Sequence, residues 1–306
     1  MERTYDALII GGGPAGLIAA LYLARFNRSA LVVDRGRGRS TSHEVNENYL
    51  GFPDGIASTE LRERGREQAR RFGAEFMADD VAAVAREVAA FRASSERREY
   101  RARTLIIATG ASDLFPDFEL MREYVGRSLF WCITCDGYKV RGQRVAVVGH
   151  DDDAAVTALQ LLNFTGRVSF VTNRLAGDSA LSDAKRGDLA RRGVPLYEGC
   201  IADVEGDDGM MRRVCLDDGR AIEIDAMFNQ QGAKPNSELA QSLGVATSPR
   251  GWITCDVEQR TNVGRVYAAG DVTRMFAHQI VTAAHEGSMA GQAANYDLYE
   301  PDQRDS

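Results

Sequence analysis

Two cysteines separated by two residues, Cys132 and Cys135, are the residues whose types and spacing are most typical of chemistry in this chain. Thiols at this spacing can close a small-ring disulfide, which stores and releases two electrons. The same pair could supply half of a zinc site, but zinc needs further ligands at close spacing. Cys200, Cys215 and Cys255 are scattered singly, and the four histidines do not cluster with them. We therefore interpret the pair as a redox centre and expect no metal site.

The composition limits the classes of protein to which the chain can belong. At 306 residues it is long enough for two domains, each with its own hydrophobic core. The formal net charge of -7 argues against general binding to nucleic acid or to an anionic membrane surface. We expect no export leader, and no apolar run approaches the roughly 18 residues that span a bilayer. Five cysteines without framework spacing suit a reducing compartment, so we expect a cytoplasmic protein.

The N-terminal part of the chain contains the complete fingerprint of a dinucleotide site. An apolar strand over residues 5–10 and an apolar helix over residues 17–25 flank the run Gly11-Gly12-Gly13-Pro14-Ala15-Gly16. In such a run Gly11 permits the tight turn, Gly13 lets a pyrophosphate approach the backbone, and Gly16 lets the helix pack on the strand. A second strand, over residues 29–33, ends in Asp34, whose carboxylate can accept a hydrogen bond from a ribose hydroxyl. The spacing predicts a Rossmann-type site.

A second strand–glycine–helix unit, over residues 144–163, interrupts the first one. An apolar strand over residues 104–109 ends at a glycine before this unit, and a similar strand ends at Gly270 after it. A motif of the first domain therefore returns after the second unit. We expect an α/β protein with two Rossmann-like domains of three β/β/α layers, the second inserted in the first. The charged stretch over residues 60–71 predicts a solvated helix face.

The order and spacing of these motifs resemble the low-molecular-weight thioredoxin reductase group of FAD-dependent disulfide oxidoreductases. The resemblance covers nearly the whole chain and rests on residues 11–16, 48–53, 108–111, 132–137 and 269–272. It implies that FAD binds a discontinuous domain of residues 1–115 and 245–306. It also implies that the inserted domain, residues 116–244, carries the disulfide and the docking site of a nicotinamide cofactor. Members of the group are homodimers, in which a domain rotation presents the disulfide alternately to flavin and to a protein substrate.

The same resemblance implies a role for each residue of the redox centre. Cys135 matches the cysteine that faces the flavin, and Cys132 matches the one that attacks the substrate disulfide. Asp136 matches the acid that protonates a departing thiolate, although an aspartate at this place is also typical of a turn cap.

The fingerprint and the resemblance together predict the residues of the FAD site. Gly270 and Asp271 match the pair that holds the ribityl chain and pyrophosphate, and His278 stands where the group has an arginine at the flavin edge. The predicted FAD-binding residues are Gly11, Gly13, Pro14, Ala15, Gly16, Asp34, Asn48, Thr109, Gly110, Gly270, Asp271, His278, Gln279 and Ile280.

The segment that should bind the nicotinamide cofactor departs from the pattern of the group. After the strand over residues 145–148 the group has G-x-G-x-x-A, but this chain has Gly149-His150-Asp151-Asp152-Asp153-Ala154. A side chain at the central position blocks the approach of a pyrophosphate, and its carboxylate repels one. Members that prefer NADPH then have H-R-R-x-x-x-R, of which only Arg174 remains, with Asp178 at the place of the last arginine. We therefore expect no use of NADPH.

A further difference from related reductases is a run of three amides. Asn229, Gln230 and Gln231 stand where those reductases are apolar. We expect these side chains either to lie on the surface or to bind an unusual ligand, for example a second flavin.

The leading hypothesis is an FAD enzyme that exchanges two electrons with a thioredoxin-like protein or a small dithiol or disulfide. The ferredoxin-linked flavin thioredoxin reductases and the diflavin-linked disulfide oxidoreductases also lack nicotinamide motifs, so ferredoxin or flavodoxin is an admissible electron donor. The alternatives are an NADPH-dependent thioredoxin reductase with an atypical cofactor site and an oxygen-dependent dithiol oxidase of the gliotoxin type. A flavin-binding redox sensor without turnover is a fourth hypothesis, against which the neighbouring acid Asp136 speaks.

Overall fold

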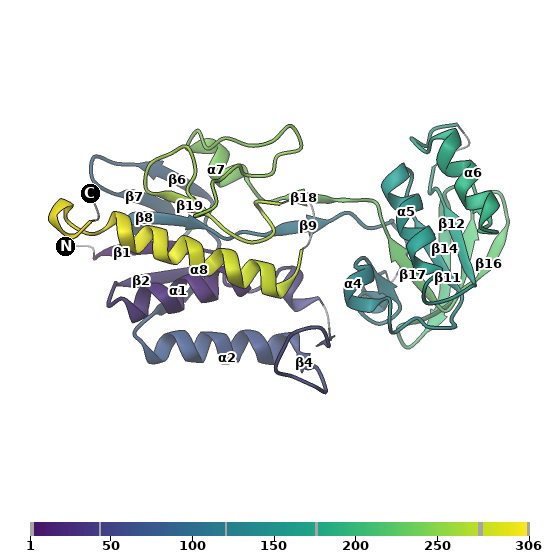
Figure 1. Cartoon of the computed structure of the whole chain (residues 1–306), viewed down its shortest axis with the longest axis horizontal. Coiled ribbons are helices and arrows are strands. Elements are labelled where there is room, and N and C mark those ends of the chain that lie inside the picture. Colours follow the sequence, from purple (N-terminus) through teal and green to yellow (C-terminus); the bar gives the residue numbers. More distant parts are fainter. Residues whose placement is uncertain (1–2, 43, 120, 175–176, 275–277, 305–306) are drawn as a thin grey trace. The chain divides into compact units, whose positions relative to one another are not determined.

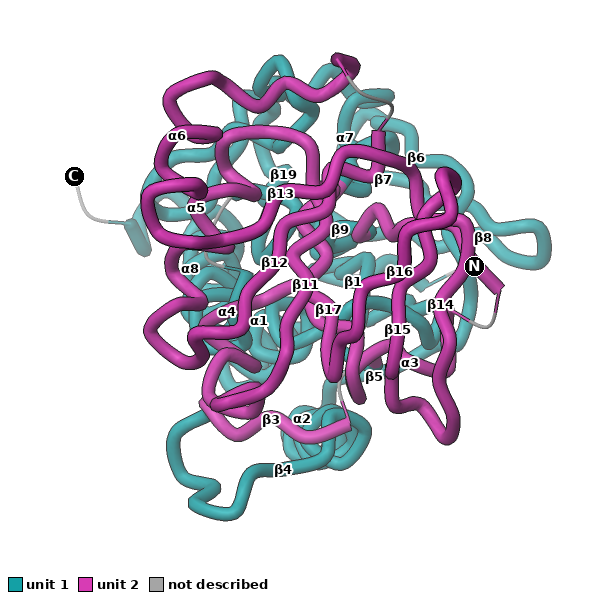
Figure 2. The backbone as a smooth tube through the Cα atoms, turned by 90° about the vertical axis from the view of Figure 1, so that its right-hand side faces the viewer, with its two compact units in different colours: residues 1–41, 49–112, 234–306 teal, residues 42–48, 113–233 magenta. Residues whose placement is uncertain are grey.

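The chain folds into two compact units, each of which is described by itself (Figures 1 and 2). The computed structural model describes residues 3–42, 44–119, 121–174, 177–274 and 278–304. Unit 1 comprises residues 1–41, 49–112 and 234–306, and unit 2 comprises residues 42–48 and 113–233. The chain changes units within two short strands that pair with each other, β9 (Ala111–Asp113) and β18 (Ala233–Pro235).

These units differ from the ranges expected from the sequence in three segments, the shortest of which, residues 113–115, belongs to unit 2. Residues 234–244 belong to unit 1 because α7 (Glu238–Ser242) buries Ala240 in the core of that unit. Residues 42–48, which include β3 (Val45–Asn46), group with unit 2, where Glu44 and Glu47 form ion pairs with arginine and lysine side chains.

Unit 1 is built on a sheet with strand order β5-β2-β1-β8-β7-β6, and β19 also pairs with β8. Strands β1, β2, β5, β8 and β19 run parallel, whereas β6, β7 and β8 are antiparallel neighbours. The bounds of the strands are β1 (Thr4–Ile10), β2 (Ala30–Asp34), β4 (Ile56–Ala57), β5 (Glu75–Ala78), β6 (Ala83–Arg86), β7 (Phe91–Ser94), β8 (Glu99–Ile107) and β19 (Val266–Ala268). The helices are α1 (Pro14–Arg25), α2 (Ser58–Arg71), α7 and α8 (Ile280–Asp297), with short 3-10 turns at Arg39–Thr41 and Pro301–Gln303.

Both faces of the unit 1 sheet are buried, which explains why β1 reads as an uninterrupted apolar run. Ala7 and Ile9 face a core shared with α1 and α8, whereas Leu8 and Ile10 face a second core that includes α7. Helices α1 and α8 pack closely because α8 places glycines at the contact. A Cβ atom added to Gly287 would lie 2.1 Å from the carbonyl oxygen of Ala15.

Unit 2 has three layers, with helices on one face of a parallel sheet and an antiparallel sheet on the other. The parallel sheet has the order β10-β17-β11-β12-β13, formed by β10 (Leu129–Phe130), β11 (Val145–Val148), β12 (Val168–Val171), β13 (Leu196–Tyr197) and β17 (Ala226–Asn229). The antiparallel strands are β14 (Ile201–Asp207), β15 (Met210–Leu216) and β16 (Ala221–Glu223). The helices are α3 (Met121–Tyr124), α4 (Ile133–Asp136), α5 (Asp152–Leu161) and α6 (Asp183–Arg191).

The alternation of side chains along β11 separates the two cores of unit 2. Val145 and Val147 contact the core beneath α5 and α6, whereas Ala146 and Val148 contact the core beneath the antiparallel sheet. The predicted α/β fold with two Rossmann-like domains is confirmed.

Candidate active site

The redox pair lies in unit 2, directly after β10. Cys132 and Cys135 form a disulfide with their Cα atoms 5.3 Å apart. Cys132 is extended and precedes α4, and its carbonyl oxygen accepts hydrogen bonds from the amides of Cys135 and Asp136. One tight turn thus brings the two sulfur atoms together, as the spacing predicts.

Asp136 follows the disulfide and is buried, with 1% of its side chain exposed. Its Oδ1 lies 3.1 Å from Nζ of Lys139, which also lies 3.6 Å from Oε2 of Glu47. The next residue must be glycine, because a Cβ atom on Gly137 would lie 2.6 Å from the carbonyl oxygen of Ile133. The motif therefore holds a buried carboxyl group on the residue directly after the disulfide.

The glycine-rich turn of unit 1 has the geometry that the fingerprint predicts. A Cβ atom on Gly11 would lie 2.3 Å from the carbonyl oxygen of Ala108, and one on Gly16 would lie 1.9 Å from that of Gly11. Gly13 is different, because its Cβ atom would approach only Oγ of Ser40, at 3.7 Å. The backbone at Gly13 is thus open to a phosphate, and Pro14 begins α1. These residues fit the pyrophosphate of FAD.

Asp34 ends β2 as predicted, but its carboxylate has partners that the sequence did not indicate. Its Oδ2 accepts hydrogen bonds from Arg62, at 2.8 Å, and from Arg66, at 3.3 Å. The prediction of a solvated helix face over residues 60–71 is wrong for these two arginines, whose side chains are only 13% and 26% exposed. Gly12 was also missed: its Cβ atom would lie 2.6 Å from Oδ2 of Asp34.

The late motif of unit 1 lies against the glycine-rich turn. A Cβ atom on Gly270 would lie 2.9 Å from Cβ of Ala15, and the amide of Gly270 donates to Oε2 of Glu286, at 2.7 Å. Asp271 forms an ion pair with Arg39, at 3.1 Å. Residues far apart in the sequence thus converge on one end of the sheet, where Rossmann-type folds bind their cofactors.

The remaining predicted flavin residues occupy ordered turns. Oγ1 of Thr109 donates to the carbonyl oxygen of Asn236, at 2.6 Å, and Gly110 has a φ of 69°. His278 packs on Trp252, and Gln279 caps α8, which begins at Ile280.

Asn48 lies in the segment 42–48 that groups with unit 2, and its role in binding FAD stays a prediction.

The acidic loop at the nicotinamide position is used by the protein itself. Oδ1 of Asp151 accepts a hydrogen bond from the amide of Ala154, at 3.0 Å, and so caps α5. Oδ1 of Asp152 accepts from the amide of Ser182, at 2.8 Å, and this bond lowers the pKa of the Asp152 carboxyl. The surviving arginine, Arg174, donates to the carbonyl oxygen of its neighbour Asn173, at 2.8 Å.

Among the three amides, Asn229 is buried, so the expectation of a surface position is wrong for this residue, whereas Gln230 and Gln231 are partly exposed. Asn229 is 3% exposed, and its Nδ2 donates to the carbonyl oxygen of Leu114, at 2.7 Å. Gln230 accepts from Thr157 of α5 and donates to the carbonyl oxygen of Trp131, the residue before Cys132, at 3.0 Å. These amides connect backbone segments of unit 2.

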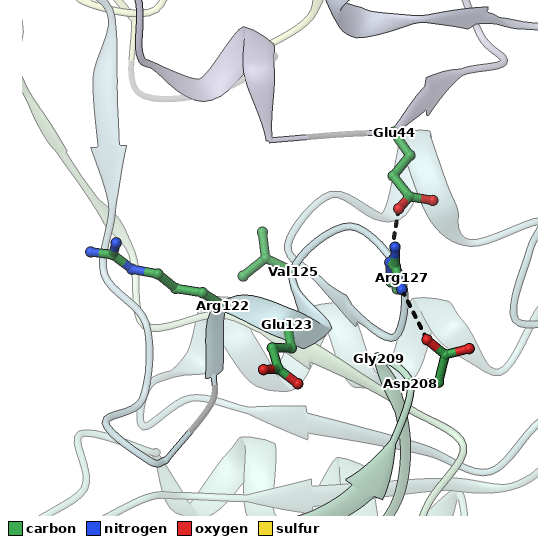
Figure 3. A pocket seen from close by; sticks show the side chains of 7 residues that line it. All are labelled: Glu44, Arg122, Glu123, Val125, Arg127, Asp208 and Gly209. Atoms are coloured by element: carbon green, nitrogen blue, oxygen red, sulfur yellow. Dashed lines mark hydrogen bonds and ion pairs between the residues drawn. The ribbon is translucent and has the colours of Figure 1, made fainter.

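Unit 2 also has a surface hollow of about 460 Å³, which is lined by a different set of residues (Figure 3). Arg127 reaches Glu44 at 2.8 Å and Asp208 at 3.6 Å, so its charge is already compensated. None of the predicted site residues is among the described residues that line it.

The cysteines outside the pair are free thiols. Burial, and then the charge of Glu286, raises the pKa of Cys255 to about 11, and burial with Glu205 also raises the pKa of Cys215. Neither thiol is poised for nucleophilic chemistry near neutral pH. The part of the chain that the structure describes holds no group of three or more metal-ligating side chains, and no helix in it is long and apolar enough to cross a membrane.

The pattern of the family described as "Pyridine nucleotide-disulphide oxidoreductase" matches residues 5–291 of this chain. The chain belongs to this family. It is 33% identical to thioredoxin reductase of Bacillus subtilis strain 168, over 98% of this chain and 96% of that protein. The protein is therefore a flavin disulfide oxidoreductase similar to thioredoxin reductase.

Two solved structures of this family show the same fold. Thioredoxin reductase from Streptococcus pyogenes MGAS5005 is 30% identical with a TM-score of 0.90, covering 97% of this chain and 99% of that chain. The atypical thioredoxin reductase TRi from Desulfovibrio vulgaris Hildenborough is 35% identical with a TM-score of 0.54, covering 96% and 98%. Membership of the family supports FAD as the cofactor.

Proposed function

We propose that this family member exchanges two electrons between FAD and a dithiol or disulfide substrate through Cys132 and Cys135, and that NADPH is not its electron donor. The observation that carries the second part is the cap of α5. Asp151 fills with its own carboxylate the helix end at which the pyrophosphate of a nicotinamide cofactor would bind. The pyrophosphate of a cofactor would have to displace this carboxylate from the helix end and would still lie close to its negative charge.

The charges around the loop oppose a pyrophosphate. Two unit charges about 4 Å apart repel each other by about 4 kcal/mol at an effective dielectric constant near 20. The favourable effect of a helix N-terminus on an anion is about 0.3–1 kcal/mol, which is smaller. Asp152 stays charged down to low pH because its pKa is lowered by the Ser182 amide. The repulsion is therefore present throughout the neutral range.

The second half of a site for NADPH is also weak. A 2′-phosphate is usually held by several guanidinium groups in a fork-shaped arrangement. Arg174 turns towards the backbone of Asn173, and the sequence offers no second arginine at the usual spacing. Two separate losses in one site support the same conclusion.

The flavin part of the proposal rests on unit 1, which we propose as the FAD-binding domain. Gly13, Asp271 and the N-terminus of α1 would hold the pyrophosphate and ribityl chain, and Asp34 would bind the ribose. Bound FAD would supply one-electron and two-electron transfer, so a one-electron carrier such as ferredoxin or flavodoxin is an admissible donor.

The residues of unit 2 would perform the exchange with the substrate. Cys132 would form the bond to the substrate sulfur, and Cys135 would be the second member of the pair. Asp136 would carry the proton of the substrate thiol, since its buried carboxyl belongs to the residue that follows Cys135 in α4. Its relatives are named thioredoxin reductases, so we propose thioredoxin or a similar protein as the first substrate to test, and a homodimer as the assembly.

Anaerobic reduction of the flavin tests the choice of donor. The holoenzyme is mixed with NADPH and then with NADH, and the flavin absorbance is followed. We expect no fast bleaching with either cofactor, followed by reoxidation of the photoreduced enzyme by thioredoxin or a small disulfide. Fast bleaching by micromolar NADPH would refute the proposal and favour an NADPH-dependent thioredoxin reductase. Reduction by a dithiol, with reoxidation by oxygen alone, would favour a dithiol oxidase.

The flavin content of the same preparation tests for a second flavin. Asn229 and Gln230 already bond to protein groups, which supports a single flavin in each chain. A ratio of two flavins per chain would contradict this, and light scattering of the same sample would report the proposed dimer.

A further inference from the structure

Lys139 forms an ion pair with the buried carboxylate beside the redox disulfide. Its Nζ lies 3.1 Å from Oδ1 of Asp136 and 3.6 Å from Oε2 of Glu47. The same ammonium group lies 6.0 Å from the centre of the Phe130 ring, within the range of a cation–π contact. The lysine side chain is therefore held between three groups and is only 28% exposed.

A carboxyl group that is removed from water favours its neutral form unless a cation compensates for the lost hydration. Asp136 is 1% exposed, and Lys139 supplies such a cation from the next turn of the chain. Glu47, which also pairs with this cation, is 54% exposed, so water screens its charge. Cys132 and Cys135 are joined in the disulfide, so neither sulfur carries a charge that would oppose this ionisation. The arrangement therefore favours the ionised carboxylate, which is a base.

We propose that Lys139 is a positioning residue that keeps Asp136 ionised in the oxidised enzyme, so that the carboxylate accepts the proton of a thiol that attacks the Cys132–Cys135 disulfide. The inference rests on the proposed function, because it assumes that Asp136 carries the proton of the substrate thiol. It adds to that function the residue that sets the protonation state of Asp136 while the Cys132–Cys135 disulfide is closed.

The oxidation balances without any further reactant. One substrate thiol gives its proton to the carboxylate of Asp136, and its sulfur forms a bond to Sγ of Cys132. The bond between Cys132 and Cys135 breaks, and Cys135 leaves as a thiolate with the electron pair. The second substrate thiol gives its proton to solvent, and its sulfur attacks the first substrate sulfur and releases Cys132 as a thiolate. The dithiol loses two electrons, and the protein disulfide gains them.

The test follows the opening of the disulfide in the oxidised holoenzyme by dithiothreitol over a range of pH. Samples are quenched in acid, alkylated at one fixed pH, and analysed by mass spectrometry for free thiols at Cys132 and Cys135. This measurement does not depend on flavin turnover. The variants are Lys139→Met, Lys139→Arg and Asp136→Asn. Lys185→Met is the matched control, because Lys185 forms an equivalent pair with Asp188, also three residues away and at 3.1 Å.

Without the lysine cation the buried carboxyl keeps its proton to higher pH, so we expect the rising limb of the rate profile to move to higher pH in Lys139→Met. Lys139→Arg and Lys185→Met should keep the wild-type profile. In Asp136→Asn the rate should fall by about 100-fold or more, and adding Lys139→Met should change it no further. If the methionine variant fails to bind FAD, Lys139→Gln gives the same comparison.

The outcomes separate the inference from the proposed function. A slow Asp136→Asn variant together with an unshifted Lys139→Met profile overturns the role of Lys139 and leaves Asp136 in the proposed function. An Asp136→Asn variant as fast as the wild type removes Asp136 from the proposed function and overturns the inference with it.

Discussion

At the scale of single residues, Cys132 and Cys135 have different surroundings although they form one disulfide. Cys132 is extended and precedes α4, whereas Cys135 lies within that turn beside Asp136. The spacing of the two cysteines predicts the bond, because three residues suffice to bring the Cα atoms to 5.3 Å. The assignment of one sulfur to the flavin and the other to the substrate comes from the resemblance and stays a prediction.

Serine substitutions test which sulfur faces the flavin. In Cys132→Ser the remaining thiolate of Cys135 should give a long-wavelength charge-transfer absorbance with oxidised FAD, because a thiolate close to the ring donates electron density. In Cys135→Ser this absorbance should be absent at every pH. The visible spectrum of each purified holoenzyme between mildly acidic and alkaline pH provides the measurement. Cys255→Ser serves as the control, since its raised pKa keeps that thiol neutral. Charge transfer in Cys135→Ser alone would reverse the assignment.

At the scale of elements, the N-terminus of α5 determines the prediction about NADPH. The sequence indicates a loss of the central glycine, but a loop of three aspartates can either repel a ligand or bind a cation. The structure shows a third use: Asp151 caps the helix and Asp152 binds the amide of Ser182. Capping by a carboxylate is favourable for the helix and occupies the amide of Ala154, one of the amides at the helix end that a phosphate would need.

Replacing the cap should separate its contribution to stability from its effect on cofactors. Asp151→Ala should lower the free energy of unfolding by about 0.5–2 kcal/mol, because the amide of Ala154 loses its acceptor. Asp151→Gly should lower the free energy of unfolding by only about 0.3 kcal/mol, because glycine is itself tolerated at an N-cap. The glycine variant should also bind NADPH more tightly than the wild type, since it restores the glycine pattern. Urea unfolding and fluorescence titration measure the two effects.

Asp153→Ala is the matched control for the cap, because Asp153 is exposed and its side chain makes no capping bond to α5. It should leave the unfolding midpoint within about 0.5 kcal/mol of the wild type. Equal stability of Asp151→Ala and Asp153→Ala would contradict the capping role.

At the scale of the whole molecule, each unit has its own pair of hydrophobic cores. All but one of the predicted FAD residues belong to unit 1, while the disulfide belongs to unit 2. Because a ligand stabilises only the states that bind it, removal of FAD should loosen unit 1 and leave the sheet of unit 2 as stable as before.

Hydrogen exchange on the holoenzyme and on the FAD-free protein measures this difference. At a concentration of 100 times its dissociation constant, FAD would stabilise unit 1 by about 2.7 kcal/mol, and amides of β1 and β2 should exchange correspondingly more slowly. Amides of β11 and β12 should exchange at the same rate in both forms. Equal loss of protection in both units would contradict the assignment of the FAD site to unit 1.

The sequence by itself determined the fold class, the redox pair and the positions of the glycine-rich turns. These features depend on contacts between near neighbours or on periodic patterns, and both can be recognised within a short segment of the sequence. The apolar runs of β1 and β11 and the cysteines three residues apart are examples. Even the insertion of one domain in the other follows from the order of the motifs.

Only the tertiary structure decided which distant residues serve these motifs. Gly12 must be glycine because of Asp34, and Gly287 because of Ala15. The side chains of Asn229 and Gln230 bond to backbone far away in the sequence. The proposed role of Lys139 follows only from the burial of Asp136, which the sequence does not show. The physical reason is the same in each case: the free energy of a polar group or a close contact depends on what the fold brings next to it, and the residue type alone does not specify that neighbour.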